Sequence, residues 1–166
     1  MKNIRKAEPG LRLINMEDVA VEQVEWLLYP FIPYGKVTII QGDPGEGKTT
    51  MVLQIIAKLT KGEPVLPVMD GGEEPAEEAE PVNVIYQTAE DGLGDTIKPR
   101  LLAAGADCSK VLVIDDSEQP LTMLDERLEE AIRQTNSRLV VLDPIQSFLG
   151  AEVDMHRANE IRPLMK

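Results

Sequence analysis

One stretch of the sequence has the residue types and the spacing that phosphate binding requires. Residues 42–49 read GDPGEGKT and fit the pattern G-x-x-x-x-G-K-[ST] at every fixed position. Glycines let the backbone curl until successive N–H groups converge on phosphate oxygens, and the N-terminus of the next helix adds its positive dipole end. The stretch therefore predicts a P-loop for a nucleoside triphosphate. ATP with magnesium is the expected ligand, because the guanine-specific pattern N-K-x-D is absent from the sequence.

The P-loop gives its polar side chains distinct expected roles. Lys48 is expected to reach the β- and γ-phosphates and to assist catalysis, and the Thr49 hydroxyl is expected to ligate magnesium, which prefers oxygen. A dinucleotide-binding pattern, G-x-G-x-x-G, does not fit, because Thr50 stands where its third glycine would be. The residues expected to contact the nucleotide are Gly42, Asp43, Pro44, Gly45, Glu46, Gly47, Lys48, Thr49 and Thr50.

Two carboxylates follow apolar runs elsewhere in the chain. Asp143 ends the run RLVVL and could hold a magnesium-bound water, or it could cap the next turn. Glu90 follows NVIYQTA and could polarise water toward the γ-phosphorus, or it could cap a helix, as could Asp91. We expect Asp143 to belong to the metal site, Glu90 to be catalytic, and Asp91 to cap a helix or support Glu90.

The elements between these residues must bring them together. Strands alternating with helices predict right-handed βαβ units and a parallel sheet, whose ligands bind beyond the carboxyl ends of the strands. Gly62 and Gly105 are expected to end the first two helices. The predicted strands are residues 36–41, 83–89, 110–115 and 138–142, and the predicted helices are residues 48–59, 93–104, 123–134 and those from about 154 onward.

The composition places these elements in one globular domain. No window of about 18 apolar residues exists, so no membrane span is expected, and the single cysteine, Cys108, fits a reducing cytoplasm. A net charge of −12 gives no electrostatic footprint for nucleic acid. Seven acidic and no basic residues fall within residues 62–81, which predicts a solvated acidic loop. We expect an N-terminal arm over residues 1–18 and the nucleotide-binding domain over residues 19–166.

Three stretches of the chain resemble a known family. GDPGEGKTT, VIYQTAEDGLGDTIKPRLLAAGAD and RLVVLDPIQSFLGAEVDMHRANEIRPLMK resemble RecA-like ATPases of the AAA-25 type, which include hexameric plasmid replicative helicases and phage or mobile-element ATPases. The resemblance covers about residues 26–166 and extends more distantly to RecA, RadA and DnaB-type motor domains. It implies an α/β P-loop NTPase fold with a RecA-like parallel sheet flanked by helices. It also implies a Walker A lysine at Lys48, a water-activating glutamate at Glu90 and a Walker B aspartate at Asp143.

The resemblance also implies how such a protein works. Members are homo-oligomers, of hexamer type in the full-length family, with ATP at subunit borders and hydrolysis coupled to DNA replication, recombination or mobile-element maintenance. They continue with a further strand, DNA-facing loops and an arginine finger, so we expect this domain to be incomplete at its C-terminus, with any DNA contact made by elements beyond it. Two other interpretations stay open: a small-molecule phosphotransferase resembling nucleoside monophosphate kinases, although no Arg-rich lid is found, and a non-catalytic nucleotide-binding module.

Overall fold

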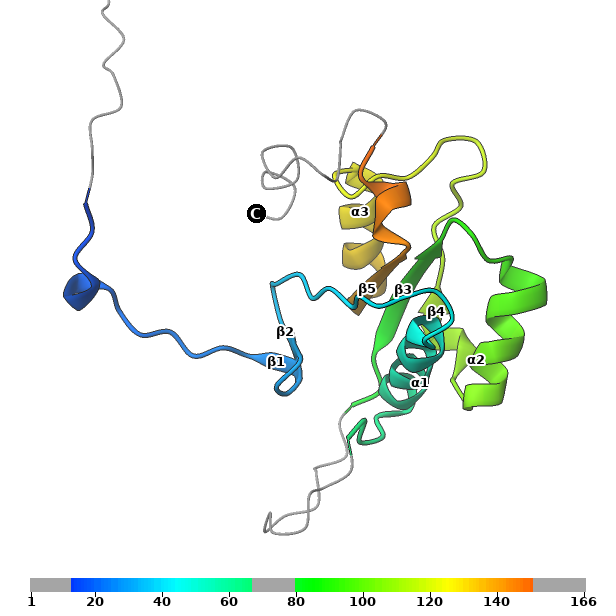
Figure 1. The fold of residues 1–166 in the computed structure, drawn as a ribbon, viewed down its shortest axis with the longest axis horizontal. Coiled ribbons are helices and arrows are strands. Elements are labelled where there is room, and N and C mark those ends of the chain that lie inside the picture. The colour runs from blue at the N-terminus through cyan, green and yellow to red at the C-terminus, as the bar shows by residue number, and fades with distance from the viewer. Residues whose placement is uncertain (1–12, 67–79, 151–166) are drawn as a thin grey trace, which may run out of the picture. The chain divides into compact units, whose positions relative to one another are not determined.

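The computed structural model describes residues 13–66 and 80–150, in two compact units of which the first ends at Lys36 and the second begins at Val37 (Figure 1). The first unit contains a 3-10 turn, Met16–Asp18, and an antiparallel hairpin of β1 (Trp26–Leu28) and β2 (Ile32–Pro33). The predicted domain bounds stay a prediction. The helix expected after about residue 154 and most of the acidic loop lie outside the described residues.

The second unit is built on the predicted parallel sheet. Its strands stand in the order β4-β3-β5, so β3 lies in the centre. In the register, Val84 faces Val111 of β4 and Thr88 faces Asp143 of β5, so β3 and β5 end side by side. Ile85 and Tyr86 are neighbours whose side chains point to opposite faces, and both are buried, as expected for a central strand covered on both faces. The strands are β3 (Asn83–Thr88), β4 (Val111–Leu112) and β5 (Ser137–Asp143).

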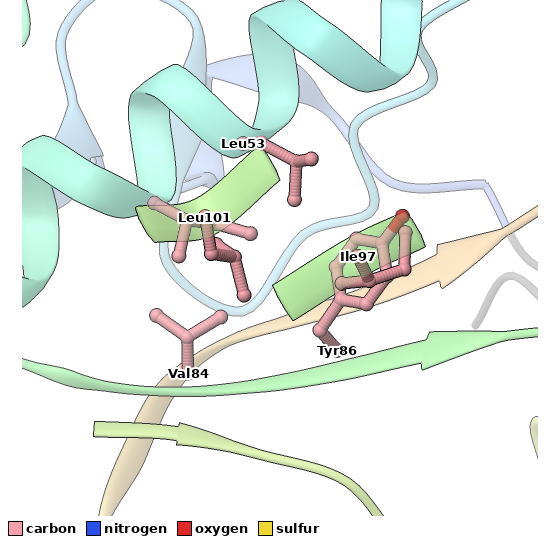
Figure 2. Packing of buried hydrophobic residues seen from close by; sticks show 6 residues of the cluster. Leu53, Val84, Tyr86, Ile97 and Leu101 are labelled. Carbon is pink, nitrogen blue, oxygen red and sulfur yellow. The ribbon is translucent and has the colours of Figure 1, made fainter. Parts of the chain in front are cut away.

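Helices cover both faces of this sheet. The connections from β3 to β4 and from β4 to β5 run in opposite directions, so right-handed crossovers place α2 and α3 on opposite faces. Figure 1 shows α1 and α2 together on one side and α3 on the other. Leu53 of α1 and Leu101 of α2 pack against Val84 and Tyr86 in the core, as Figure 2 shows. The helices are α1 (Lys48–Lys61), α2 (Lys98–Ala104) and α3 (Glu126–Thr135).

Helix ends agree with the sequence best where glycine ends them. Gly62 and Gly105 have φ of 69° and 81°, a conformation that only glycine adopts readily, and they end α1 and α2 as predicted. The start of α2 differs from the prediction, because Leu93–Ile97 forms a π turn before the α-helix begins at Lys98. Pro99 lies in the first turn of α2, where its missing N–H costs no hydrogen bond.

Two other helix predictions need correction. The apolar residues at helical spacing in residues 48–59 include Met51, which predicts that Met51 belongs to the buried face of α1. Met51 is instead 48% exposed, and the buried face contains Leu53, Ile56 and Ala57. The predicted helix over residues 123–134 begins only at Glu126, because the Asp125 side chain accepts a hydrogen bond from the Arg127 N–H at 2.9 Å and caps the helix there.

The strand predicted over residues 36–41 is wrong. These residues form no strand, and Val37 and Ile39 are 51% and 61% exposed. A β-branched run favours an extended backbone, but a strand also needs a neighbour to take up its hydrogen bonds. Within residues 13–66 and 80–150 no strand pairs with this segment. The strand predicted over residues 110–115 is likewise reduced to Val111–Leu112.

None of the helices in the part of the chain that the structure describes is both long enough and apolar enough to cross a membrane.

Candidate functional site

Two glycines shape the P-loop. Gly45 and Gly47 have φ of 84° and 83°, in the region where an L side chain is strained. Gly47 is the N-cap of α1, so the helix begins at Lys48 and presents its first N–H groups to the loop, an arrangement that suits an anion. Of the residues predicted to contact the nucleotide, Gly42, Asp43, Pro44, Gly45, Glu46 and Gly47 precede α1, and Lys48, Thr49 and Thr50 form its first turn.

Side chains of the P-loop make hydrogen bonds to the backbone of the loop itself. The Lys48 ammonium donates to the carbonyl oxygens of Gly42 and Asp43 at 2.8 and 2.7 Å. The Glu46 carboxylate accepts the Asp43 N–H at 2.7 Å. An ammonium has three donors, so Lys48 can hold these two carbonyls and still offer a proton to an anion.

The P-loop helix and the end of β5 meet at one hydrogen bond. The Thr49 hydroxyl donates to Oδ2 of Asp143 at 3.0 Å, although the two residues are 94 positions apart in the chain. Asp143 is the last residue of β5, as the sequence predicts. A hydroxyl has one proton and two acceptor lone pairs, so Thr49 can donate to Asp143 and keep oxygen lone pairs for a cation.

This pair fits magnesium better than a cation that needs a full protein cage. Within residues 13–66 and 80–150 no group of three or more His, Cys, Asp or Glu side chains forms a ready-made metal site. Magnesium in nucleotide sites takes only one or two protein ligands and completes its shell with water and phosphate oxygens. Thr49 and Asp143 supply oxygen atoms of that kind at the P-loop, and their role as metal-site residues stays a prediction.

Glu90 lies at the same edge of the sheet. It is exposed and follows the end of β3 by two residues, and Thr88 at that end faces Asp143 in the register. The alternative role as a helix cap is wrong for both Glu90 and Asp91, because the cap position of the next helical segment is Gly92. Asp91 instead pairs with Arg100 of α2 at 3.6 Å.

A cavity of about 500 Å³ opens beside the P-loop. Gly45 and Lys48 of the P-loop and Arg100 and Ala103 of α2 are among the residues that line it. The volume lies within the range of small-molecule sites. Arg100 thus lines the same cavity as the phosphate-binding loop.

Tyr86 is a site residue that the motifs do not mark. Its hydroxyl donates to Oδ2 of Asp143 at 3.0 Å, so this oxygen accepts from both Tyr86 and Thr49. Burial and the neighbouring Asp143 carboxylate raise the pKa of Tyr86 well above its usual value, which keeps the hydroxyl protonated as a donor. The sequence signal for Tyr86 was a phenol in the middle of a predicted buried strand, where its O–H needs a hydrogen-bond partner.

Gln87 was also missed by sequence reasoning. Its buried side-chain amide donates to the Ile114 carbonyl at 3.2 Å and accepts the Ile114 N–H at 2.7 Å. The side chain thereby continues the pairing of β3 beyond the end of the short strand β4. It helps to fix the edge of the sheet at which Glu90 stands.

Comparison with known proteins identifies the family. Searches of curated proteins and of solved structures gave no significant match. A family model for the AAA domain, AAA_25, matches residues 7–166, and AAA domains of this type are nucleotide-binding, ATPase-like modules. The model spans nearly the whole chain and includes the P-loop, Glu90 and Asp143, so this protein belongs to the AAA_25 family of AAA domains.

Proposed function

We propose that this chain is a RecA-like ATP-binding core that holds ATP with magnesium on its P-loop and hydrolyses it. The observation that carries the proposal is the hydrogen bond between Thr49 and Asp143. It joins the start of the phosphate-binding helix to the carboxylate at the end of β5, and both groups are needed where a metal ion must touch phosphate and protein together.

Different residues of the chain would bind the phosphates, hold the metal ion and activate water. The first N–H groups of α1 and the Lys48 ammonium bind and orient the phosphates. Thr49 and Asp143 would hold magnesium, directly and through a bound water, and the ion would neutralise charge that develops on the phosphate oxygens. Glu90 accepts a proton from water and orients it toward the γ-phosphorus. The cavity beside the loop, with Arg100 at its edge, would receive the rest of the nucleotide.

Titration of ATP into the wild-type chain and Lys48→Ala, with magnesium present, tests the binding proposal. Removing the ammonium leaves the phosphates without their charge-assisted partner, so the dissociation constant should rise by about tenfold or more. Lys58→Ala is the matched control, because Lys58 lies in the same helix but pairs with Glu63 at 2.6 Å. Equal affinity in wild type and Lys48→Ala would contradict the P-loop assignment.

The cellular process is proposed from the resemblance described above. Hydrolysis would serve DNA replication, recombination or mobile-element maintenance, in a homo-oligomer with ATP at its subunit borders. Phosphate release measured with and without single-stranded DNA, on a protein that also carries the DNA-facing elements expected beyond this domain, tests the coupling to DNA. Stimulation by DNA would support the role, and equal rates in that protein would count against it.

A further inference from the structure

We propose that Tyr86 is a positioning residue for Asp143. Its hydroxyl orients the Asp143 carboxylate so that one carboxylate oxygen stays available for a magnesium-bound water. The inference rests on the proposed function and adds to the site a group that does not itself touch nucleotide or metal. It is carried by the contact between the Tyr86 hydroxyl and Oδ2 of Asp143 at 3.0 Å.

The ring of Tyr86 is fixed by the core. Tyr86 has no exposed surface and belongs to one buried cluster with Leu53 of α1, Val84 of β3, Ile97 before α2 and Leu101 of α2, as Figure 2 shows. Protein interiors are close-packed, so a ring in this position has little freedom to move. Its hydroxyl is therefore a fixed point from which a neighbouring side chain can be oriented.

The two donors at Asp143 leave one oxygen for the metal site. Thr49 and Tyr86 both donate to Oδ2, each at 3.0 Å. A carboxylate oxygen has two lone pairs, so these hydrogen bonds use the acceptor capacity of Oδ2. Oδ1 would then remain available to accept a hydrogen bond from a magnesium-bound water.

The two donors belong to different parts of the fold. Thr49 is in the first turn of the P-loop helix, whereas Tyr86 is in the central strand. A shift of the loop on nucleotide binding would disturb the contact from Thr49 but not the one from Tyr86. Tyr86 thus keeps the carboxylate oriented while the loop adjusts.

Magnesium dependence of nucleotide binding separates this role from simple core packing. ATP is titrated into wild type and Tyr86→Phe, once with EDTA and once with magnesium, and the ratio of the two affinities is the magnesium enhancement. Tyr86→Phe keeps the ring, so its affinity in EDTA should equal that of wild type. Its enhancement should fall by about tenfold, the loss expected when a partner of a metal-site group is removed. Tyr29→Phe is the matched control, since Tyr29 is 70% exposed.

The possible results separate a positioning role of Tyr86 from a packing role and from failure of the proposed function. A wild-type enhancement in Tyr86→Phe overturns the positioning role, and so does an equal loss in EDTA and in magnesium, which is what damaged packing would give. A wild-type chain that binds no ATP, or binds it independently of Lys48, overturns the proposed function itself. The double variant Tyr86→Phe with Asp143→Asn adds a test of mechanism. Without the carboxylate, the Tyr86 change should cause no further fall in enhancement, and additive losses would contradict the inference.

Discussion

Asp143 is the residue at which three parts of the second unit meet. The P-loop helix reaches its carboxylate through Thr49 and the central strand through Tyr86, while its backbone carbonyl accepts the Ala89 N–H at 3.2 Å. A side chain held from several directions keeps a single orientation, and site geometry depends on such supporting contacts. We therefore regard Asp143, rather than the loop alone, as the centre of the candidate site.

Replacing Glu90 by Gln tests the chemistry at the edge of the sheet. An amide cannot accept the proton of the attacking water, so steady-state phosphate release from magnesium–ATP should fall by about 100-fold or more. The affinity for ATP should stay unchanged, because Glu90 is not expected to hold the phosphates. Glu118→Gln, at an exposed acid after β4, is the control. An unchanged rate in Glu90→Gln would remove it from water activation.

Single residues could be predicted where a short motif marks them. Lys48 and Thr49 follow from their spacing to the loop glycines, and Asp143 follows from the apolar run before it. Tyr86 and Gln87 could not be predicted in this way, because their partners lie 57 and 27 positions away along the chain. Only the register of the sheet brings those partners within hydrogen-bond distance.

Helices and strands, like single residues, could be predicted where their cause is local in the sequence and not where it depends on distant residues. Local rules predicted the ends of α1 and α2, since positive φ at a glycine needs nothing from the rest of the fold. They also predicted β3 and β5 to within a residue, because each contains an apolar run bounded by polar residues. They failed at residues 36–41, where forming a strand depends on a neighbour elsewhere in the chain.

The start of α1 should depend on glycine at position 47. A Cβ at Gly47 would meet no atom within 4 Å, so Gly47→Ala should cost only backbone strain, about 1–2 kcal/mol of the free energy of unfolding. Gly94→Ala is a matched control, because its Cβ also meets nothing within 4 Å and its φ is not positive. Urea unfolding measures both variants. Equal stabilities would show that the left-handed conformation at Gly47 is not what requires glycine.

At the scale of the whole molecule, every residue of the candidate site lies in the unit that begins at Val37. The hairpin of β1 and β2 belongs to the first unit and contributes no predicted site residue. Family membership could be predicted from three stretches of sequence, because motif and strand pattern occur together in them. The division of the chain at Lys36 had no comparable local signal.

Oligomerisation is a property of the whole molecule. AAA domains often oligomerise, so with ATP and magnesium we expect a species several times heavier than the 18.4 kDa monomer. Sedimentation velocity over a range of concentrations measures this. Lys48→Ala should not respond to ATP, whereas Lys58→Ala should behave like wild type. A wild-type chain that stays monomeric at every concentration would contradict the prediction.

The Lys48 ammonium already donates hydrogen bonds to two carbonyl oxygens of its own loop, and this limits what a ligand can gain by binding there. Two of its three donors are already in use, so an anion with a single charge can gain only the third donor unless it displaces an existing contact. A triphosphate brings several charged oxygens at once and also meets the N-terminus of α1, so its gain exceeds what the loop gives up. We therefore expect the loop to bind polyphosphates more tightly than anions of lower charge.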